Sequence, residues 1–436
     1  MQTITIHPSK LKGAITIAPS KSVMQRVCAA ALLHKGTTII HNPGKSNDDV
    51  VAVQIIQQLG ATVLYKENTI EIISNGLNPI SSSIDCGESG LSARMFASIV
   101  ALFDKPIIIK GHGSLLKRPL AWFNDIFPLL DISINSTNNY LPLKIQGKLK
   151  PKNIVVDGSS SSQYLTGLLM AYSYAIQNNA EIKNGETFTI TVINLNSKPY
   201  IDLTLDVMKT FGMLVPENLN YEKFIFHKTN QPINQSTNQP INIKIEGDWS
   251  GAAFFLVAAA IHGNNIVKGL QPNSYQADKK IMEVLQKACA NFIYNNDDYI
   301  FSETKELNAF DFDATDCPDL FPPLVALASF CNGISTIKGV HRLANKESNR
   351  ALSLQTEFKK FGVSIEFKDN IMFIHPPTEI SGGIFHSQND HRIAMAIAIV
   401  ASKANGKVIL ENADAINKSY PSYYADLEKL GLIICE

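Results

Sequence analysis

The chain of 436 residues has no excess of charge of either sign and no long apolar run. Its 39 basic and 39 acidic residues give a formal net charge of zero, which argues against a general basic field that binds nucleic acid or a membrane surface. No apolar run reaches the roughly 18 residues that a membrane helix needs, and no signal-peptide pattern follows Met1. We therefore expect a soluble, cytoplasmic protein without nucleic-acid or membrane partners, in which any basic site is local.

Cysteine is scarce and widely spaced. The six cysteines form no CxxC pair; they are Cys28, Cys86, Cys289, Cys317, Cys331 and Cys435. This spacing predicts neither a zinc knot nor a disulfide framework, so we expect most of them to be buried thiols. No spacing of His and Glu suggests a metal site, and we expect no cofactor.

Two glycine-containing stretches resemble nucleotide-binding motifs but lack essential residues. Gly44-Lys45-Ser46 matches the end of a P-loop, yet Ile39 stands where the motif needs its first glycine. Gly111-His112-Gly113 has no third glycine after it. A dinucleotide-binding fold therefore has no support in the sequence.

A weak repeat does organise the chain, whose length predicts two domains. A unit of roughly 70 residues occurs six times, each beginning with a polar turn and an Ala/Leu-rich helix that is apolar on nearly all sides. The apolar helices are predicted to follow the turns at Ser20, Ser89, Ser161, Gly247, Cys317 and Asn389. Second, amphipathic helices are predicted from Asp48, Tyr200 and Lys346, and β-branched runs such as Thr37–His41, Pro106–Gly111 and Ile334–Gly339 are predicted strands.

The repeats predict an α/β fold of two domains, each with three sheets around three buried helices. Residues 1–20 read as a pair of strands that complete the C-terminal half. We therefore expect one domain from 1–20 plus 245–436 and another from 21–244, joined by two chain crossings that form a hinge. Thr229–Asn242 duplicates the letters NQPIN and is predicted to be an exposed hairpin tip or loop insertion.

Basic residues recur at predicted helix starts and strand ends. Alone, each is typical of a solvated surface charge; together they fit a small substrate that carries several negative charges. They are Lys21, Arg26, Arg94, Arg118, Arg350, Arg392 and Lys418. The serines of 159–162 before Gln163 fit either a helix cap or a phosphate and polyol site.

Several acidic residues are candidates for proton transfer. They are Asp319, Glu347 beside Lys346, Asp390 with His391, and Asp48 with Asp49. An acidic residue that opens a helix is commonly a cap or a partner of the helix dipole. Neither role accounts for the basic neighbours of Asp319 and Glu347.

Taken in order along the chain, seven motifs resemble those of the 5-enolpyruvylshikimate-3-phosphate synthases, the 3-phosphoshikimate 1-carboxyvinyltransferases of the shikimate pathway. The motifs are PSKSVMQR at Pro19–Arg26, LLKRP at Leu115–Pro119, GSSSSQYLTGLLM at Gly158–Met170, SKPYIDLTLDVMKTFG at Ser197–Gly212, KESNR at Lys346–Arg350, NDHRIAMA at Asn389–Ala396 and NKSYPSYY at Asn417–Tyr424. The resemblance covers essentially the whole chain. It implies a two-domain inside-out α/β barrel, each domain built from three repeated βαβαββ-type units.

The resemblance also implies the substrates and the residues that bind them. The shikimate 3-phosphate site would comprise Lys21, Ser22, Arg26, Ser161, Ser162, Gln163, Ser197, Tyr200, Asp319 and Lys346. The phosphoenolpyruvate site would comprise Lys21, Gly90, Arg118, Gln163, Arg350, Arg392 and Lys418. We expect a monomer that needs only these two small molecules.

The implied reaction transfers the enolpyruvyl group of phosphoenolpyruvate to the 5-hydroxyl of shikimate 3-phosphate and releases phosphate. Its catalytic residues would be Asp319, Glu347 and Lys21, and the resemblance leaves open which of them moves which proton. Like charges about 4 Å apart repel by about 4 kcal/mol at an effective dielectric of 20, so cations from both domains are expected to close around the two anionic substrates.

The chain departs from the family pattern in three places. Its segment ESGLSARM, residues 88–95, stands where the family has NAGTAMRP, which leaves the local phosphoenolpyruvate contacts and glyphosate sensitivity open. Ala344 replaces an Arg that is common in the family, and Asn349 replaces an Asp. We expect catalysis to survive the last two changes.

Two other functions compete with this one. A UDP-N-acetylglucosamine enolpyruvyl transferase usually carries a reactive Cys before an ArgPro pair, and the segment Gly111–Pro119 has none. A noncatalytic scaffold would be expected to lose the catalytic residues, but Lys21, Asp319 and Glu347 are all present.

Overall fold

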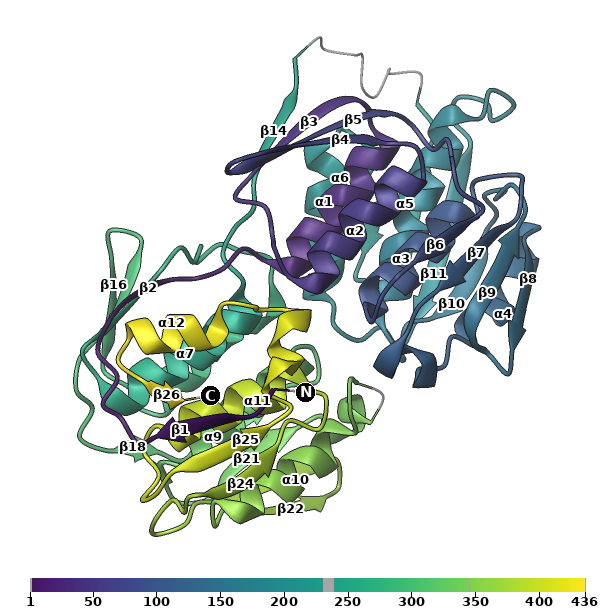
Figure 1. Cartoon of the computed structure of the whole chain (residues 1–436). Helices are drawn as coiled ribbons and strands as arrows, with labels where there is room; N and C mark the ends of the chain where they lie inside the picture. The colour runs from purple at the N-terminus through teal and green to yellow at the C-terminus, as the bar shows by residue number, and fades with distance from the viewer. Residues whose placement is uncertain (1, 230–238, 345, 436) are drawn as a thin grey trace. The chain divides into compact units, whose positions relative to one another are not determined.

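The computed structural model describes residues 2–229, 239–344 and 346–435. The chain divides into two compact units, which we call the inserted unit (Lys21–Ile245) and the outer unit (Met1–Ser20 with Glu246–Glu436). Figure 1 shows helices and sheets in both units.

Among its described residues, the inserted unit contains three four-stranded sheets and six α-helices. Its helices are α1 Lys21–Leu33, α2 Asn47–Gln58, α3 Gly90–Val100, α4 Trp122–Ile126, α5 Ser162–Asn178 and α6 Pro199–Thr210. The strand order of its first sheet is β14 Ile241–Lys244, β3 Lys35–His41, β5 Thr69–Asn75 and β4 Thr62–Lys66. The order of the second is β6 Ser83–Asp85, β7 Ile107–Lys110, β9 Tyr140–Gln146 and β8 Ser133–Thr137. The order of the third is β10 Ile154–Asp157, β11 Thr187–Ile193, β13 Lys223–His227 and β12 Glu217–Leu219.

The outer unit repeats this plan and adds one two-stranded sheet. Its helices are α7 Trp249–His262, α8 Ile281–Lys287, α9 Phe321–Ala328, α10 Arg350–Lys360, α11 His391–Ala401 and α12 Tyr423–Lys429. The strand order of its first four-stranded sheet is β2 Gly13–Thr16, β15 Asn265–Lys268, β17 Asp298–Phe301 and β16 Phe292–Asn295. The order of the second is β19 Asp311–Asp313, β21 Ser335–Lys338, β23 Ile371–His375 and β22 Ser364–Lys368. The order of the third is β24 Gly383–His386, β25 Val408–Glu411, β1 Ile4–His7 and β26 Ile433–Cys435. The short sheet pairs β18 Leu307–Asn308 with β20 Cys331–Asn332.

All six four-stranded sheets share one topology. In each, one edge strand pairs in parallel with its neighbour, and the remaining strands pair antiparallel. The six repeats predicted from the sequence are therefore confirmed. The N-terminal strands lie in sheets of the outer unit, with β1 between β25 and β26 and β2 beside β15.

The apolar helix of each repeat lies in the core of its unit. Every residue of α3, α7, α9 and α11 is buried, as expected for helices whose sequence is apolar on nearly all sides. A glycine allows α3 and α5 to pack closely, because a Cβ at Gly167 would lie 2.4 Å from the carbonyl oxygen of Met95. Sheets thus surround buried helices in each unit, which is the inside-out arrangement.

Two local predictions were wrong. The helix expected from Lys346 begins at Arg350, because the side chain of Asn349 caps it by accepting from the backbone N–H of Leu352. The predicted loop Thr229–Asn242 ends in a strand, since Ile241 and Asn242 belong to β14 and pair in parallel with β3. Residues 230–238 of that predicted loop lie outside the described part of the chain.

The two chain crossings meet within the outer unit in what we call the crossover clasp. The backbone N–H of Ser20 donates to the carbonyl of Glu246 at 2.8 Å, and that of Asp248 donates to Ala18 at 2.9 Å. The buried Gln276 side chain bonds both segments: it accepts from the Ser20 hydroxyl and donates to the Gly247 carbonyl. Hydrogen bonds therefore hold the backbone of the first crossing up to Ser20 and that of the second crossing from Glu246 onward.

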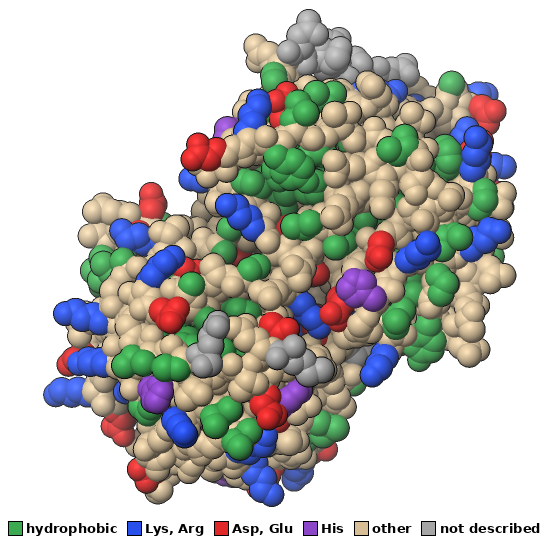
Figure 2. Space-filling view, in the orientation of Figure 1, with side chains coloured by type: hydrophobic (Ala, Val, Ile, Leu, Met, Phe, Trp, Pro, Cys, Tyr) green, Lys and Arg blue, Asp and Glu red, His purple; other side chains and the backbone are tan. Residues whose placement is uncertain are grey.

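On the face shown in Figure 2, acidic and basic side chains are interspersed, without a large area of one sign. Within the described ranges, no helix has the length and hydropathy that a membrane crossing requires. Four cysteines are buried and two are exposed, and all are free thiols, so the expectation of mostly buried thiols is confirmed.

Candidate active site

In the inserted unit, the start of α1 presents a lysine that is held by an acidic residue of α2. Lys21 Nζ donates to Asp48 Oδ2 at 2.9 Å, and both side chains are largely buried. The next residue, Asp49, is instead part of a capping box with Ser46 at the start of α2. Burial raises the pKa of Asp49 to about 7, although its hydrogen bonds to Ser46 oppose this shift. Of the two predicted acid candidates, Asp48 therefore contacts Lys21, and Asp49 caps the start of α2.

Arg26 lies one turn further along α1 and is fully enclosed. Its guanidinium donates to the Thr204 hydroxyl at 3.0 Å and to the Ser22 carbonyl at 2.8 Å, and it lies over the Tyr200 ring. Burial lowers its pKa to about 10, so it remains a cation at neutral pH. The structure thus brings together three residues that were predicted to share one site: Ser22, Arg26 and Tyr200.

Two arginines converge at the first residue of α3. A Cβ at Gly90 would lie 2.6 Å from Nη1 of Arg94 and 2.9 Å from Nη1 of Arg118. Arg94 Nη1 also donates to Gln163 Oε1 at 3.0 Å, which ties α3 to the start of α5. Three residues predicted for phosphoenolpyruvate binding, Gly90, Arg118 and Gln163, are therefore neighbours.

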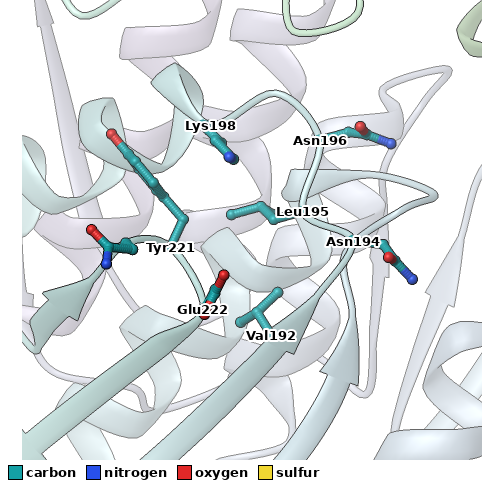
Figure 3. A pocket seen from close by; sticks show the side chains of 8 residues that line it. Val192, Asn194, Leu195, Asn196, Lys198, Tyr221 and Glu222 are labelled. Atoms are coloured by element: carbon teal, nitrogen blue, oxygen red, sulfur yellow. The ribbon is translucent and has the colours of Figure 1, made fainter.

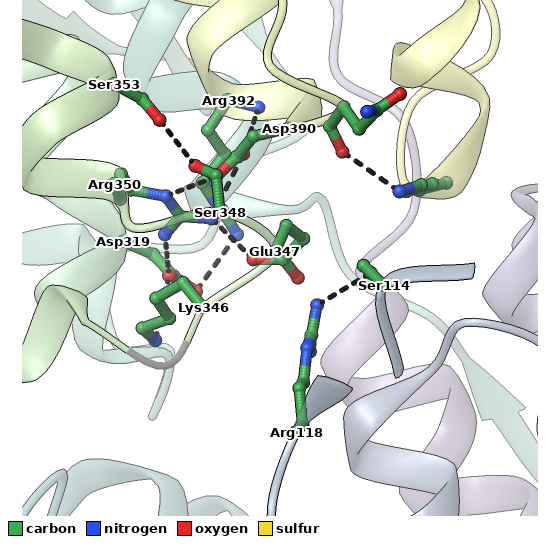
Figure 4. Close-up of polar contacts among 12 residues, drawn as sticks. Ser114, Arg118, Asp319, Lys346, Glu347, Ser348, Arg350, Ser353, Asp390 and Arg392 are labelled. Atoms are coloured by element: carbon green, nitrogen blue, oxygen red, sulfur yellow. Dashed lines mark hydrogen bonds and ion pairs between the residues drawn. The ribbon is translucent and has the colours of Figure 1, made fainter. Parts of the chain in front are cut away.

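A glutamate that departs from the family pattern holds the loop that carries Arg118. Glu88 Oε2 accepts from the backbone N–H of Ser114 at 2.8 Å, and the Ser114 hydroxyl accepts from Arg118 Nη2 at 3.2 Å. Figure 4 shows this contact of Arg118 with Ser114. The carboxylate of Glu88 thus bonds the backbone beside Arg118.

The serine-rich turn before α5 has the capping role that the sequence left open. Ser161 is the N-cap, and its hydroxyl accepts from the backbone N–H of Gln163 at 3.3 Å. Ser162 is the first residue of the helix and is buried. Ser197, at the start of the next predicted segment, is buried with a positive φ of 59°, and its carbonyl accepts from the Tyr200 N–H.

In the outer unit, the guanidinium of Arg350 is the centre of an ion-pair cluster (Figure 4). It donates to Asp390 through Nε at 2.9 Å, to Asp319 through Nη1 at 2.8 Å and to Glu347 through Nη2 at 2.7 Å. The side chain of Arg350 is fully buried. Burial opposes its charge, but Asp390, Glu347 and Asp319 outweigh that effect and raise the pKa of Arg350 above its ordinary value.

Asp319 is shared by three cations. Besides Arg350, Lys346 Nζ lies 3.2 Å from its Oδ1, and Arg392 Nη2 lies 3.1 Å from its Oδ2. Burial by itself raises the pKa of Asp319, but the charges of Arg392, Lys346 and Arg350 hold it well below its ordinary value. Burial lowers the pKa of Lys346, against the charge of Asp319. At neutral pH, Asp319 is therefore a carboxylate within hydrogen-bond reach of a lysine.

Asp390 orients this cluster from the start of α11. Its fully buried carboxylate accepts from Arg350, from the Ser348 hydroxyl at 3.2 Å and from the backbone N–H of Arg392 at 3.0 Å. Lys418 Nζ donates to the carbonyl of Asn389, the residue that precedes Asp390, at 2.9 Å. The sequence named Asp390 as a proton-transfer candidate, but its geometry is that of a residue that holds two arginines in place.

Sequence reasoning missed one acidic neighbour of this cluster. Asp278 is fully buried and accepts a hydrogen bond from the Ser250 hydroxyl at the start of α7. Burial and the charge of Asp319 raise the pKa of Asp278 to about 6. Its position in the amphipathic segment before α8 gave no signal in the sequence, since only the folded chain brings it towards Asp319 and Arg392.

The described residues offer no arrangement suited to a metal ion, in that no group of three or more His, Cys, Asp or Glu could hold one. A pocket of about 360 Å³ opens at the end of β11 and the start of α6 (Figure 3). Its lining is mostly polar and includes Asn194, Asn196, Lys198 and Tyr221, but none of the predicted site residues. We therefore place the candidate site at the two charged clusters rather than in this pocket.

Comparison with known proteins identifies the family of this chain. Residues 6–427 match the family described as EPSP synthase (3-phosphoshikimate 1-carboxyvinyltransferase). The chain belongs to the EPSP synthase family. It is 36% identical to the 3-phosphoshikimate 1-carboxyvinyltransferase of Clostridium novyi over 446 residues, which cover 100% of this chain and 99% of that protein. It is 35% identical to the protein of the same name from Clostridioides difficile, over 99% of this chain and 98% of that protein.

A solved EPSP synthase structure from Acinetobacter baumannii has the same fold. The TM-score is 0.81, each chain is covered completely, and the sequence identity is 21%. The family, the enzyme class and the two-domain inside-out α/β fold predicted from the sequence are therefore confirmed. The roles of individual residues in this EPSP synthase family member stay predictions.

Proposed function

We propose that the two charged clusters are the two parts of the active site of a 3-phosphoshikimate 1-carboxyvinyltransferase. The enzyme transfers the enolpyruvyl group of phosphoenolpyruvate to the 5-hydroxyl of shikimate 3-phosphate and releases inorganic phosphate. Family membership supports the reaction, since curated relatives of full length carry this name. The observation that carries the assignment is the Asp319 carboxylate shared by Lys346, Arg350 and Arg392.

Shikimate 3-phosphate is proposed to bind through residues of both units. In the inserted unit, its ring and its phosphate would contact Lys21, Ser22, Arg26, Ser161, Ser162, Gln163, Ser197 and Tyr200. In the outer unit, Asp319 and Lys346 would contact its hydroxyl groups. Charge supports this division, because Arg26 is a buried cation beside hydroxyls, whereas Asp319 is a carboxylate that accepts hydrogen bonds.

Phosphoenolpyruvate is proposed to bind where guanidinium and ammonium groups concentrate. Its binding residues would be Lys21, Gly90, Arg118, Gln163, Arg350, Arg392 and Lys418. Arginine forks match carboxylate and phosphate groups in two-point contacts. Arg350 already donates hydrogen bonds to three carboxylates of the protein. We therefore expect a bound substrate anion to replace some of these hydrogen bonds.

Proton transfer is assigned from the charge states. Asp319 is ionised at neutral pH because neighbouring cations hold its pKa low, so it can accept a hydrogen bond from the attacking 5-hydroxyl and is the candidate to take up its proton. Glu347 and Lys21 are then the candidates to protonate the methylene carbon of phosphoenolpyruvate, which makes C2 electrophilic. Phosphate then leaves the resulting tetrahedral adduct while a proton is removed from its methyl group, which restores the C=C bond of the enolpyruvyl product. The cations of both units stabilise the charge that develops on the departing phosphate.

The assignment carries expectations about the enzyme's setting. We propose a cytoplasmic monomer that acts on two small molecules, without a nucleic-acid or membrane partner. The balanced charge of the chain supports this, since 39 basic and 39 acidic residues leave no general field for a polyanionic surface.

A phosphate-release assay tests the function directly. Purified protein is given phosphoenolpyruvate with either shikimate 3-phosphate or UDP-N-acetylglucosamine as acceptor. We expect phosphate release, and formation of 5-enolpyruvylshikimate 3-phosphate, with the first acceptor only. Release with the second acceptor alone would favour the related transferase, and release with neither would refute both.

A further inference from the structure

Arg94 is a buried arginine that neither predicted substrate site includes. It lies in the first half of α3 with 8% of its surface exposed. Its Nη1 donates to the Gln163 side chain at 3.0 Å and to the Gly90 carbonyl at 3.3 Å, and its guanidinium lies 5.3 Å from the centre of the Tyr164 ring. Its Nε–H is buried and has no hydrogen-bond partner among the described residues.

The charge of Arg94 is not matched by an acidic side chain. Within the described part of the chain, its contacts are an amide, a carbonyl and an aromatic ring, and none is a carboxylate. A buried cation normally has an anionic partner, because removing it from water is costly. Arg350 in the outer unit follows this rule with three carboxylates, so Arg94 stands in contrast to it.

A second guanidinium lies on the other side of the same glycine. The Cβ position of Gly90 is within 3 Å of an Nη1 atom of both Arg94 and Arg118, so any side chain there would push against both. Two neighbouring cations at a helix N-terminus repel each other unless an anion lies between or beside them. The glycine keeps the space beside both guanidinium groups clear of a side chain.

We propose that Arg94 is a further substrate-binding residue, which together with Arg118 binds one anionic group of phosphoenolpyruvate beside Gly90. The group is a carboxylate or a phosphate, since both accept two-point hydrogen bonds from arginine. Gln163 orients the Arg94 fork, and the ring of Tyr164 supports it. This inference rests on the proposed function, and the experiment separates the two.

The experiment begins with the wild-type protein, because phosphate release from phosphoenolpyruvate and shikimate 3-phosphate tests the function before any variant is made. Arg94→Met then removes the charge and keeps a long stem over Tyr164, whereas Arg94→Lys keeps the charge but loses the fork. Lys360→Met is the matched control, because Lys360 also lies over an aromatic ring, 5.6 Å from the centre of Phe385 in the outer unit. Circular dichroism melting checks that each variant folds.

We expect Arg94→Met to raise the KM for phosphoenolpyruvate by roughly 10- to 100-fold, as for the loss of a charge-assisted hydrogen bond, and to change the KM for shikimate 3-phosphate by less than about threefold. Arg94→Lys should lie between this variant and wild type, and Lys360→Met should match wild type. Inhibition by inorganic phosphate identifies the anionic group that Arg94 binds. If Arg94→Met weakens this inhibition in parallel with the rise in KM, the group is the phosphate of phosphoenolpyruvate. If the inhibition is unchanged, the group is the carboxylate.

Three outcomes would overturn the inference in an active enzyme. The KM for phosphoenolpyruvate could stay unchanged in Arg94→Met, both KM values could rise equally, or only kcat could fall. The last result would show that Arg94 acts only through Gln163. If Arg94→Met does not fold, Arg94→Lys still decides, since an unchanged KM for phosphoenolpyruvate there would mean that the fork binds no substrate anion. An inactive wild-type protein would refute the function instead.

Discussion

The guanidinium of Arg350 and the carboxylate of Asp319 form the centre of the ion-pair cluster in the outer unit. The motif KESNR and the position of Asp319 were enough to predict that both are site residues. Their mutual contact was not predictable, because Arg350 reaches Asp319 and Asp390 across 31 and 40 residues of sequence. Only the fold brings α9, α10 and α11 together, and with them the carboxylates that surround one guanidinium.

Glu347 is predicted to act in chemistry rather than in binding. Glu347→Gln keeps the size of the side chain and a hydrogen-bond acceptor for Arg350, but it removes the group that transfers a proton. We expect kcat to fall by roughly 10²- to 10⁴-fold with both KM values within a few-fold of wild type. Steady-state kinetics would measure this, with Glu366→Gln, an exposed glutamate, as the control. Near-normal turnover would exclude the proton role.

His262 is predicted to make the outer unit less stable in acid. Its Nδ1 accepts from the Leu11 N–H at 3.3 Å and its Nε2 contacts the Ser402 hydroxyl at 2.8 Å, so the neutral ring fits this site. Burial lowers its pKa to about 4, with the charges of Lys403 and Lys10 acting in the same direction. As the pH falls, His262 is protonated in the unfolded chain before it is protonated in the folded protein. The stabilisation that the neutral ring contributes is therefore complete above pH 6.5 and is lost as the pH falls towards 4.

The expected loss of unfolding free energy from this one group is about 3 kcal/mol between pH 6.5 and 4. Denaturant titrations at several pH values in this range would measure it. His262→Gln, whose amide can accept from Leu11 and donate to Ser402 without titrating, should lose less stability over the same range. An equal loss in the variant and in wild type would contradict the assignment.

At the scale of elements, the apolar helices were the most predictable features. Their sequences are apolar on nearly all sides, a pattern typical of helices enclosed by other structure, and all six lie where the repeats predicted. Element ends were less predictable. The start of α10 at Arg350 depends on the cap supplied by Asn349, and β14 forms in a polar segment because β3 offers it an unpaired edge.

Close packing of α3 on α5 is predicted to depend on Gly167. In Gly167→Ala, the added methyl group would meet the backbone of Met95, which cannot rotate away as a side chain would. We expect the variant to lose about 2 kcal/mol of unfolding free energy. Gly406→Ala is the matched control, because a Cβ there would meet only the Cα of Gly382, at 4.0 Å. Denaturation midpoints of both variants would show whether only the first is destabilised.

At the scale of the whole molecule, two charged clusters lie in different units, and the proposed reaction requires both. We predict that shikimate 3-phosphate, alone or with glyphosate, lowers the radius of gyration measured by small-angle X-ray scattering. Substrate anions offset the repulsion between cations of the two units and so favour closure. Lys21→Met should weaken the response, and unchanged scattering with both additions would leave closure without support.

The crossover clasp was invisible to sequence reasoning. The sequence predicted two crossings and a hinge, but Gln276 lies 256 residues after Ser20, whose hydroxyl it accepts from. A lone glutamine before an amphipathic segment carries no recognisable pattern. Its role follows only from the pairing of Ala18–Ser20 with Glu246–Asp248.

Strand β1 imposes an order on how this protein is made. It leaves the ribosome before its partners β25 and β26, which lie far along the chain, since Thr5 pairs with both Ile409 and Cys435. The inserted unit, by contrast, is complete once β14 has emerged and can fold during synthesis. The nascent outer unit must therefore hold β1 unpaired until β25 and β26 have been synthesised.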